Sequence, residues 1–453
     1  MTGSSIIVVA AYFVFISMPY LSRLKLSERN YGSFAVGHRK YNWFWIMCGL
    51  SATYIGGAAV LNLPSLGYTY GWYGLSDVLP TSLALILSAT ILAPLSRQKA
   101  AFSLGTFIRQ RGRLAIFTVG LLSAVVYTLI AAAQISALTT ILQAYVPISR
   151  SVLSILSTLG VVAYVFIGGY QSVTFTDIVQ FLCMLLMYFA PVGLFAIIFV
   201  NPGAPTPLPA SATIPMPADM MLLLAIAFLF IPVSQDLHIR LQSANSLFDA
   251  KYGTLLSGIV YLLFGCISVG VGVVLAKRGL SLPSPDDAVP VFLQQTFASF
   301  SFIPTIAILA VILSTLDAMI FSASTAIGYE VWDIFRSRLE DRDSHSAQWG
   351  TILVGCTALV IALLAPRILA LILPALVIYV SVLLPLLLGF ALKVNERIIA
   401  TLALIALVTV VILEAFHINF PYRAFVYVGV HALVVVFVKI TGISVGRINI
   451  NES

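Results

Sequence analysis

Residues 43–70, WFWIMCGLSATYIGGAAVLNLPSLGYTY, form an apolar stretch that is long enough to cross a bilayer. The stretch also carries residues that weaken or interrupt an α-helix, namely Gly49, Gly56, Gly57, Asn62, Pro64 and Gly67. In lipid, an interrupted helix persists only where it lines a cavity or binds a ligand, because free backbone N–H and C=O groups are costly there. The stretch therefore predicts either a kinked structural span or a helix whose unwound middle binds an ion and a solute.

The composition of the whole chain is that of a membrane protein. Of its 453 residues, 60% are hydrophobic and 9% are charged, whereas soluble domains carry about 25% charged residues. Apolar runs of about 20 residues, the length that crosses a bilayer, recur along the entire sequence. We therefore expect an all-α polytopic membrane protein without a sizeable soluble domain.

Thirteen apolar runs are long enough to be transmembrane helices. We place them at 4–22, 43–69, 71–96, 114–145, 149–168, 173–200, 219–241, 250–277, 303–330, 347–366, 368–392, 397–416 and 422–441. With the N-terminus outside and the C-terminus in the cytoplasm, 19 of the 24 Lys and Arg residues fall in cytoplasmic segments, as the positive-inside rule requires. This rule also explains the net charge of +7 without nucleic acid. We expect a multi-pass protein of the cell (inner) membrane.

Several smaller features fit this arrangement. The first run lacks a preceding basic segment and an obvious cleavage site, so we expect a retained helix rather than a signal peptide. We expect the Pro-rich outer loop 201–218 to be extended, and the mixed-charge stretch 336–345 to be a solvated helix end. Four cysteines lie within apolar runs without metal-ligand spacing, and we expect them to be core residues. They are Cys48, Cys183, Cys266 and Cys356.

The spans also show an internal symmetry. We expect four parts: 1–42 with an extra N-terminal helix and cytoplasmic loop, 43–200 with five spans, 219–392 with five more, and 393–453 with two helices and a short cytoplasmic tail. Because five is odd, the second set must be inverted relative to the first. Its first helix is also interrupted, in FLFIPVSQD, where Pro232 precedes the polar residues Ser234, Gln235 and Asp236. Paired interrupted helices in inverted repeats indicate the midplane site of a transporter.

The span 303–330 carries a stripe of small and hydroxylic side chains. At 3.6 residues per turn, one face holds Val311, Ser314, Thr315, Ala318 and Ser322. Small faces of this kind commonly let helices pack closely. Alternatively, the adjacent hydroxyls of Ser314 and Thr315, near the midplane, could supply oxygen ligands to a hard cation such as Na⁺. Carbonyls freed by an interrupted helix would complete such a site.

Three acids lie within spans, where charged side chains are costly and usually functional. Asp177 lies near the cytoplasmic end of its span, Asp317 lies just inside the midplane, and Asp77 lies in the outer half of span 71–96. The alternative interpretation is an acid that is hydrogen-bonded at a helix end, which suits Asp177 better than Asp317. The sequence shows no nucleophile–base pair, phosphate loop or metal cluster, so we do not expect an enzyme.

Three motifs resemble those of the sodium:solute symporter family, which includes bacterial sodium/proline, pantothenate, sialic acid and sugar symporters. GGYQSVTFTDIVQ resembles the family signature, LSTLDAMIFSASTAIGYEVWDIF resembles the sodium-binding helix, and SQDLHIRLQSANS resembles the end of the second interrupted helix. The motifs occur in the family's order, and the resemblance covers nearly the whole chain. It implies a LeuT-type fold with a 5+5 inverted repeat, about 13 transmembrane helices and alternating access.

The resemblance also implies a sodium site, with Na⁺ as the coupling ion. Its ligands would be the backbone carbonyls of Ala52, Ile55 and Val311 and the hydroxyls of Ser314 and Thr315. Asp177 matches the family's Asp near the sodium exit route, and we assign Asp317 to the ion pathway as well. Two positions depart from the family pattern. Tyr54 stands where sodium/proline members often have Asp, and Gly56 stands where Ser is common.

The residues left to bind a solute mix polar groups with aromatic rings. They are Asn62, Tyr68, Asp77, Tyr127, Gln134, Phe230, Gln235 and Tyr379. This mixture suits a compact, partly apolar molecule, and we expect an amino acid or a small carboxylate. Ala227 and Ile372 stand where sugar transporters of the family carry polar side chains, which argues against a sugar. Asp77 could pair with an ammonium group or be a structural acid.

These observations predict Na⁺-coupled symport of a small organic solute across a lipid bilayer. One alternative is a proton-coupled symporter of the same fold, with Asp177 or Asp317 as the proton carrier. A second alternative is a receptor that binds the solute without moving it. A channel is not favoured, because the sequence shows no filter-like loop or charged ring. The sequence leaves the oligomeric state open.

Overall fold

The structure of the chain is a computed structural model. The structure describes residues 3, 7–14, 31–98, 103–107, 113–143, 145–189, 192, 218–279, 282, 285–297, 300, 302–332, 344–365, 368–392, 394, 405, 408–409 and 423–441. Within these ranges all regular elements are helices, and a single β-bridge joins Tyr41 to Ala244. The predicted all-α class is therefore confirmed. The predicted span 397–416 and the segments 201–218 and 336–345 lie largely outside the described residues.

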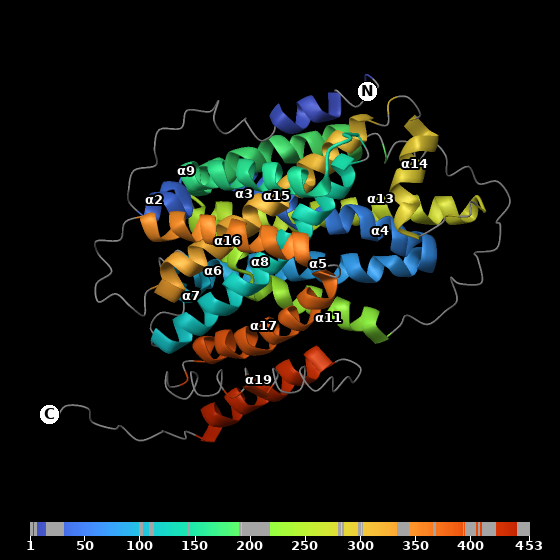
Figure 1. The fold of residues 1–453 in the computed structure, drawn as a ribbon. Coiled ribbons are helices and arrows are strands. Elements are labelled where there is room, and N and C mark those ends of the chain that lie inside the picture. The colour runs from blue at the N-terminus through green and yellow to red at the C-terminus, as the bar shows by residue number, and fades with distance from the viewer. Residues whose placement is uncertain are drawn as a thin grey trace.

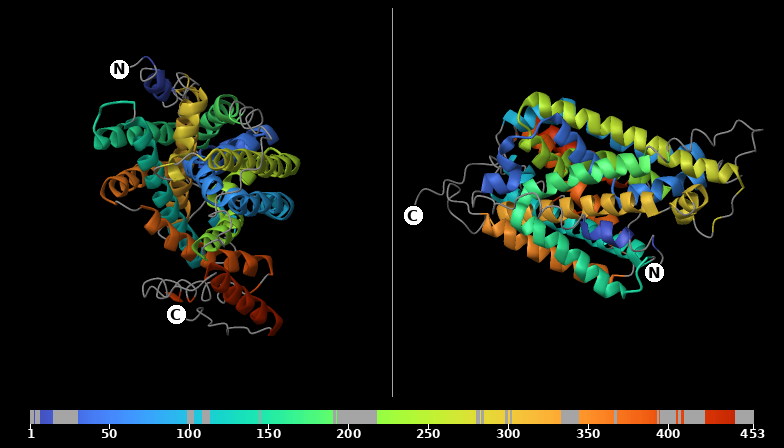
Figure 2. Two further views of the ribbon diagram at one scale, coloured as in Figure 1. Left: turned by 90° about the vertical axis from the view of Figure 1, so that its right-hand side faces the viewer. Right: turned by 90° about the horizontal axis from the view of Figure 1, so that it is seen from above.

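Most of the long helices run along a common direction (Figures 1 and 2). The α-helices are α2 (Tyr31–Val36), α3 (Trp43–Tyr54), α4 (Gly57–Tyr70), α5 (Leu75–Leu87), α6 (Ala93–Gln98), α7 (Leu104–Phe107), α8 (Arg113–Gln143), α9 (Arg150–Met184), α11 (Ala218–Val233), α12 (Gln235–Ser243), α13 (Leu247–Lys277), α14 (Ala288–Phe297), α15 (Phe302–Ala326), α16 (His345–Leu364), α17 (Ile368–Ala391) and α19 (Arg423–Thr441). Short 3₁₀ or π turns connect or extend them: η1 (Gly37–Arg39), η2 (Gly71–Gly74), η3 (Ser88–Leu92), η5 (Leu185–Phe189), η7 (Pro285–Asp287) and η9 (Ile327–Val331).

Six helical runs among the described residues are long and apolar enough to cross a membrane. They are Ala59–Arg97, Ala115–Gln143, Arg150–Phe189, Leu247–Lys277, Phe302–Val331 and His345–Leu364. These runs are those of a multi-pass membrane protein. They do not establish the predicted number of thirteen crossings. Two of the runs contain a glycine with left-handed backbone, Gly71 (φ 62°) and Gly169 (φ 52°), so a single run can contain more than one crossing.

The chain folds back on itself at Gly169, within α9. Gly169 has φ 52° and ψ −138°, a conformation that glycine adopts most readily because it lacks a Cβ. Ser172 Oγ donates to the carbonyl of Tyr164 at 3.1 Å, whereas eight residues of straight helix would separate the two by about 12 Å. The spans predicted at 149–168 and 173–200 therefore meet directly at Gly169, without a separate loop between them.

The core of the molecule is built around α15. Every residue from Pro304 to Ala326 is buried, and α3, α8, α9 and α16 pack around this helix (Figure 1). A helix that is apolar on all sides is stable when neighbours cover all of its sides. The predicted small and hydroxylic stripe is therefore one face of a helix that is buried throughout.

Both predicted helix interruptions are confirmed. Ile55 and Gly56 separate α3 from α4, and Ser234 separates α11 from α12. The two interruptions touch, since the hydroxyl of Tyr54 and Ser234 Oγ form a hydrogen bond of 2.6 Å. Ser234 Oγ also accepts the backbone N–H of Leu237 at 3.2 Å and so caps α12. The pair of broken helices thus meets at the points where both are unwound.

The segments predicted to be cytoplasmic lie together at one end of the molecule. Tyr41 forms the β-bridge with Ala244, and Arg97 Nη1 donates to the carbonyl of Ala244 at 2.8 Å. The backbone N–H of Gly105 donates to Glu330 Oε1 at 2.8 Å. We call the end that contains these five residues the inner end, and the opposite end the outer end. The positive-inside rule predicts that the inner end faces the cytoplasm.

The prediction that all four cysteines are core residues is wrong. Cys48 is buried, Cys183 and Cys266 are half-buried, and Cys356 is exposed on α16. The reason is that lipid tails are as apolar as the protein interior. An apolar run in a membrane protein therefore does not distinguish a side chain in the core from one that faces lipid.

Candidate functional site

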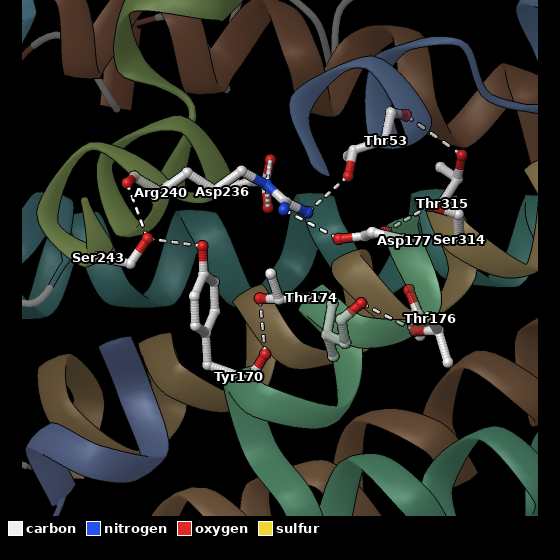
Figure 3. A network of polar contacts seen from close by, with 12 residues as sticks. Thr53, Tyr170, Thr174, Thr176, Asp177, Asp236, Arg240, Ser243, Ser314 and Thr315 are labelled. Atoms are coloured by element: carbon white, nitrogen blue, oxygen red, sulfur yellow. Dashed lines mark hydrogen bonds and ion pairs between the residues drawn. The ribbon is translucent and has the colours of Figure 1, made fainter. Parts of the chain in front are cut away.

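A buried cluster of charges lies beside the two interruptions, with Arg240 at its centre (Figure 3). Arg240 Nε donates to both oxygens of Asp236, at 3.1 and 3.0 Å. Its Nη1 donates to Asp177 Oδ2 at 2.9 Å, and its Nη2 donates to Thr53 Oγ1 at 2.7 Å. All four residues are buried. Buried ion pairs of this kind persist when hydrogen bonds satisfy the remaining polar atoms, and here each guanidinium nitrogen has an acceptor.

Two hydroxyls connect this cluster to α15. Ser314 Oγ donates to Asp177 Oδ1 at 2.6 Å. Thr315 Oγ1 lies 3.2 Å from the carbonyl oxygen of Thr53 (Figure 3). It also lies 3.2 Å from the carbonyl oxygen of Val311. Together with the guanidinium, these contacts form a ring that joins α3, α9, α12 and α15. Side chains far apart in sequence are therefore held together around the end of α3.

Two glycines allow this close approach. A Cβ on Gly49 would overlap Arg240 Nη1, and a Cβ on Gly56 would lie 2.7 Å from Thr315 Oγ1. The sequence predicted these glycines as residues that weaken a helix. The structure shows a second reason for them, because any side chain at Gly49 or Gly56 would displace a group of the ring.

The structure brings together the residues predicted to bind sodium. Thr315 on α15 contacts the last turn of α3 at Thr53, close to Ala52 in that turn and Ile55 just after it, both of which are buried. The backbone N–H of Ile55 donates to the carbonyl of Ser51. Because α3 ends here, the other carbonyls of its last turn have no following helical turn to bond. The candidate ligands are all oxygen atoms, which fits a hard cation such as Na⁺.

Asp317 also lies on α15, but its side chain contacts α9 at other residues than Asp177. Its Oδ2 accepts hydrogen bonds from the Tyr164 hydroxyl at 2.6 Å and from Thr176 Oγ1 at 2.8 Å, both on α9. Asp317 is fully buried, and its Oδ1 has no hydrogen-bond partner among the described residues. The two acids assigned to the ion pathway therefore differ, since Asp177 is paired with Arg240 whereas Asp317 is held by hydroxyls.

Three of the predicted solute residues gather at the second interruption. The ring centroids of Phe230 and Tyr379 are 5.5 Å apart. The ring centroid of Tyr127 lies 6.0 Å from that of Phe230 and 6.4 Å from that of Tyr379. The Tyr379 hydroxyl donates to the carbonyl of Val233 at 2.8 Å, and the Tyr127 hydroxyl accepts the backbone N–H of Asp236 at 3.4 Å. We call these three rings the aromatic cluster. The rings form an apolar wall, and the two hydroxyls satisfy backbone groups freed by the interruption.

The other predicted solute residues are spread more widely. Gln134 lies at the first interruption, where its Oε1 would be 3.1 Å from a Cβ on Gly57 and has no hydrogen-bond partner in the described part of the chain. Asn62 is exposed on α4, and Tyr68 and Asp77 are half-buried near the outer end. These last three residues therefore do not belong to the aromatic cluster.

Gln235 makes contacts at the inner end. Its Nε2 donates to Glu330 Oε1 at 3.0 Å, and its Oε1 accepts the backbone N–H of Leu104 at 3.1 Å. The residue is fully buried. Both ends of its amide thus bind protein groups rather than facing the aromatic cluster.

Sequence reasoning did not select Arg240, Thr53 or Glu330 as site residues. For Arg240 a signal was present, because Asp236 and Arg240 are four residues apart on a helix that directly follows an interruption. Thr53 carries no comparable signal. Its contacts depend on how α12 and α15 approach the end of α3.

Comparisons with known proteins bear on the family and on the fold. Residues 34–208 match the model of the sodium:solute symporter family. The structure is similar to that of a Na⁺-coupled sialic acid symporter in a substrate-bound outward-open state, with 13% sequence identity, a TM-score of 0.72 and coverage of 96% of this chain and 98% of that chain. It is also similar to a nucleobase-cation-symport-1 family transporter, closed with bromovinylhydantoin bound, with 14% identity, a TM-score of 0.58 and coverage of 90% and 94%. A search of curated proteins found no match. The predicted resemblance to the family is confirmed over residues 34–208, and the LeuT-type fold is confirmed, whereas the count of thirteen helices is not.

Proposed function

We propose that this chain, whose residues 34–208 match the sodium:solute symporter family, is a Na⁺-coupled symporter. It imports a small organic solute by alternating access, with two inverted sets of five helices at 43–200 and 219–392. The N-terminus lies outside and the C-terminus in the cytoplasm, so the inner end faces the cytoplasm. This orientation follows the distribution of Lys and Arg.

The observation that carries this proposal is the group of oxygen atoms between the end of α3 and α15. Thr315 Oγ1 lies 3.2 Å from the carbonyl oxygens of both Thr53 and Val311. Ser314, the next hydroxyl, contacts the buried carboxylate of Asp177. Na⁺ is bound here as a transported ion by the hydroxyls of Ser314 and Thr315 and by carbonyls of Ala52, Thr53, Ile55 and Val311.

The solute binds beside the aromatic cluster of Tyr127, Phe230 and Tyr379, with Gln134 as a polar contact. Aromatic walls with few polar groups suit a compact molecule, and we assign the solute to the amino acids or small carboxylates. The two ligands are coupled because both contact α3 and α4 at their interruption. Each favours the same outward-facing state, so each raises the affinity for the other. A membrane potential of about 100 mV adds about 2.3 kcal/mol for each charge moved inward.

The ion leaves on the inner side past Asp177. This carboxylate is 2.6 Å from Ser314 on one side and 2.9 Å from Arg240 on the other. Asp177 is therefore placed between the proposed ion site and α12. We assign Asp317, one turn further along α15, to the same pathway.

The test is the double variant Ser314→Ala and Thr315→Ala, reconstituted in proteoliposomes. A thermal-shift screen of amino acids, carboxylates and vitamins, with and without Na⁺, first identifies the solute. Na⁺-stimulated uptake is expected to be lost. The matched control is Ser322→Ala on the same helix, whose Oγ is buried and contacts no partner in the described residues; it should keep its Na⁺ stimulation. If uptake by the double variant keeps its Na⁺ stimulation unaltered, the sodium assignment is wrong.

Proton coupling is the alternative that a specific observation favours. Asp317 is fully buried, with one carboxylate oxygen that has no partner among the described residues, and a proton would neutralise it. Uptake driven by a pH gradient in the absence of Na⁺, and abolished by Asp317→Asn, would establish this alternative. Solute binding without uptake or counterflow would instead indicate a receptor.

A further inference from the structure

Glu330 is a buried acid at the inner end that the proposed sodium site does not use. It lies in η9, the π-helical turn that continues α15, and is 0% exposed. Its Oε1 accepts the backbone N–H of Gly105 at 2.8 Å and an N–H of the Gln235 amide at 3.0 Å. A single carboxylate oxygen therefore joins three elements, namely α7, α12 and the end of α15.

The surroundings of Glu330 fit this contact closely. A Cβ on Gly105 would lie 2.5 Å from Glu330 Cδ, and a Cβ on Gly120 of α8 would overlap Glu330 Cβ. The absence of side chains at both positions lets η9 lie directly against α7 and α8. Leu104 also donates its backbone N–H to the Gln235 amide oxygen at 3.1 Å. Residues 104–105 are thus joined to α12 twice, once directly and once through the carboxylate.

Glu330 is bound by hydrogen bonds rather than by an ion pair among the described residues. No Lys or Arg in the described ranges forms an ion pair with it, in contrast to Asp177 and Asp236, which both bind Arg240. Hydrogen bonds between a carboxylate and neutral N–H groups are easier to break than a buried ion pair. Glu330 can therefore hold neighbouring elements in one state of the protein and release them in another.

We propose that Glu330 is a positioning residue that keeps the inner end closed, because its hydrogen bonds to Gly105 and Gln235 join α7 and α12 to the end of α15. We call these two hydrogen bonds the tie. Gln235, the partner of Glu330 on α12, directly follows the interruption at Ser234. Movement of α12 about this interruption withdraws the Gln235 amide from Glu330. Opening of the inner pathway therefore breaks the tie. This inference rests on the proposed function, since inner opening is a step of alternating access.

Cys48 provides a natural reporter of inner opening. It is fully buried in α3, whose first residue, Trp43, lies at the inner end. Replacing the other three cysteines by Ser leaves Cys48 as the single thiol among the four cysteines of the chain. Its alkylation by a hydrophilic maleimide is then measured on purified protein in lipid nanodiscs, where the reagent reaches both ends.

Two substitutions of Glu330 test the tie. Glu330→Ala removes the carboxylate and with it the hydrogen bonds to Gly105 and Gln235. Cys48 alkylation is expected to become about tenfold faster, which corresponds to the net free energy of one charge-assisted hydrogen bond. Glu330→Gln keeps the shape but loses the charge that strengthens the bonds, so a smaller acceleration is expected. The control is Asp287→Asn in η7, an acid near the outer end, which should leave the alkylation rate unchanged. If Glu330→Ala does not fold, the Gln variant alone decides the outcome.

Adding Na⁺ separates this inference from the proposed function. In a Na⁺ symporter, Na⁺ favours the outward-facing state and should slow Cys48 alkylation, including in the Glu330 variants. A Na⁺ effect without acceleration in either variant overturns the tie and leaves symport standing. Acceleration without a Na⁺ effect supports the tie and counts against Na⁺ coupling. A merely structural role would lower the thermal stability of both variants without accelerating alkylation in either of them, and this result also overturns the tie.

Discussion

Replacing Gly49 by Ala is expected to break the contact between Arg240 and Asp177. The added Cβ would overlap Arg240 Nη1 and lie 3.4 Å from Asp177 Oδ2. The guanidinium is at the end of a flexible side chain and can move, but Asp236 and Thr53 hold its other nitrogens. Any movement that relieves the overlap therefore lengthens the 2.9 Å ion pair with Asp177.

The size of the effect follows from this contact. A hydrogen bond to a charged group contributes about 1.5–3 kcal/mol. Gly49 lies inside α3, where Gly→Ala alone would stabilise the helix by about 0.5–1 kcal/mol. The net destabilisation is therefore expected to be about 1.5 kcal/mol, within a range of about 0.5–2.5 kcal/mol.

The assay is thermal unfolding of the purified protein in detergent, without Na⁺, followed by intrinsic fluorescence. The matched control is Gly270→Ala in α13, where the nearest atom to the added Cβ, in the Trp72 ring, lies at an ordinary 3.6 Å. Gly270→Ala should leave the unfolding midpoint unchanged or raise it, whereas Gly49→Ala should lower it. A double-mutant cycle with Asp177→Asn adds a second criterion. The cost of Asp177→Asn should shrink in the Gly49→Ala background, because the ion pair is already lost there.

Two results would refute this reasoning. Equal unfolding midpoints for Gly49→Ala and Gly270→Ala would show that the guanidinium moves without losing a contact. Strict additivity of Gly49→Ala and Asp177→Asn would show that the two changes act independently. Either result would remove Gly49 from the account of the charge cluster.

Two further changes test contacts at the interruptions. Tyr54→Phe removes only the hydroxyl that bonds Ser234 at 2.6 Å; it should lower stability by about 0.5–1.5 kcal/mol and slow uptake, and normal values for both would show that this link is dispensable. Gly56→Ala places a Cβ 2.7 Å from Thr315 Oγ1, so displacement of this one ligand should raise the Na⁺ concentration for half-maximal uptake about tenfold. An unchanged Na⁺ dependence would argue against Thr315 as a sodium ligand.

The interruptions were predictable because their cause is local. Gly56 and Pro232 act on the backbone of their own helix, and in lipid the cost of a free N–H or C=O falls on that same segment. The hydroxyl pair Ser314 and Thr315 was predictable for a similar reason, since helical geometry alone places the two next to each other. Composition and apolar periodicity were sufficient for the all-α membrane class, and the local breaks for the two interruptions, whereas the sodium site remains a proposal.

The contacts that complete the site depend on which helices meet. Arg240 lies in a polar run that reads equally well as a solvated helix end, and only the approach of α3, α9 and α12 buries it against Asp177, Asp236 and Thr53. The partners of Gln235 at the inner end likewise come from α7 and η9, more than 90 residues away on either side.

The sequence by itself determined that the chain crosses a membrane, where its helices break and which hydroxyls stand near the break. The physical reason is that backbone satisfaction in lipid and side-chain direction along a helix are properties of a single segment. The tertiary structure decided which side chains bind Arg240, that Gln235 contacts Glu330, and that Cys356 faces outward rather than into the core. These outcomes depend on pairs of segments, and an apolar surrounding has the same composition whether lipid or protein supplies it.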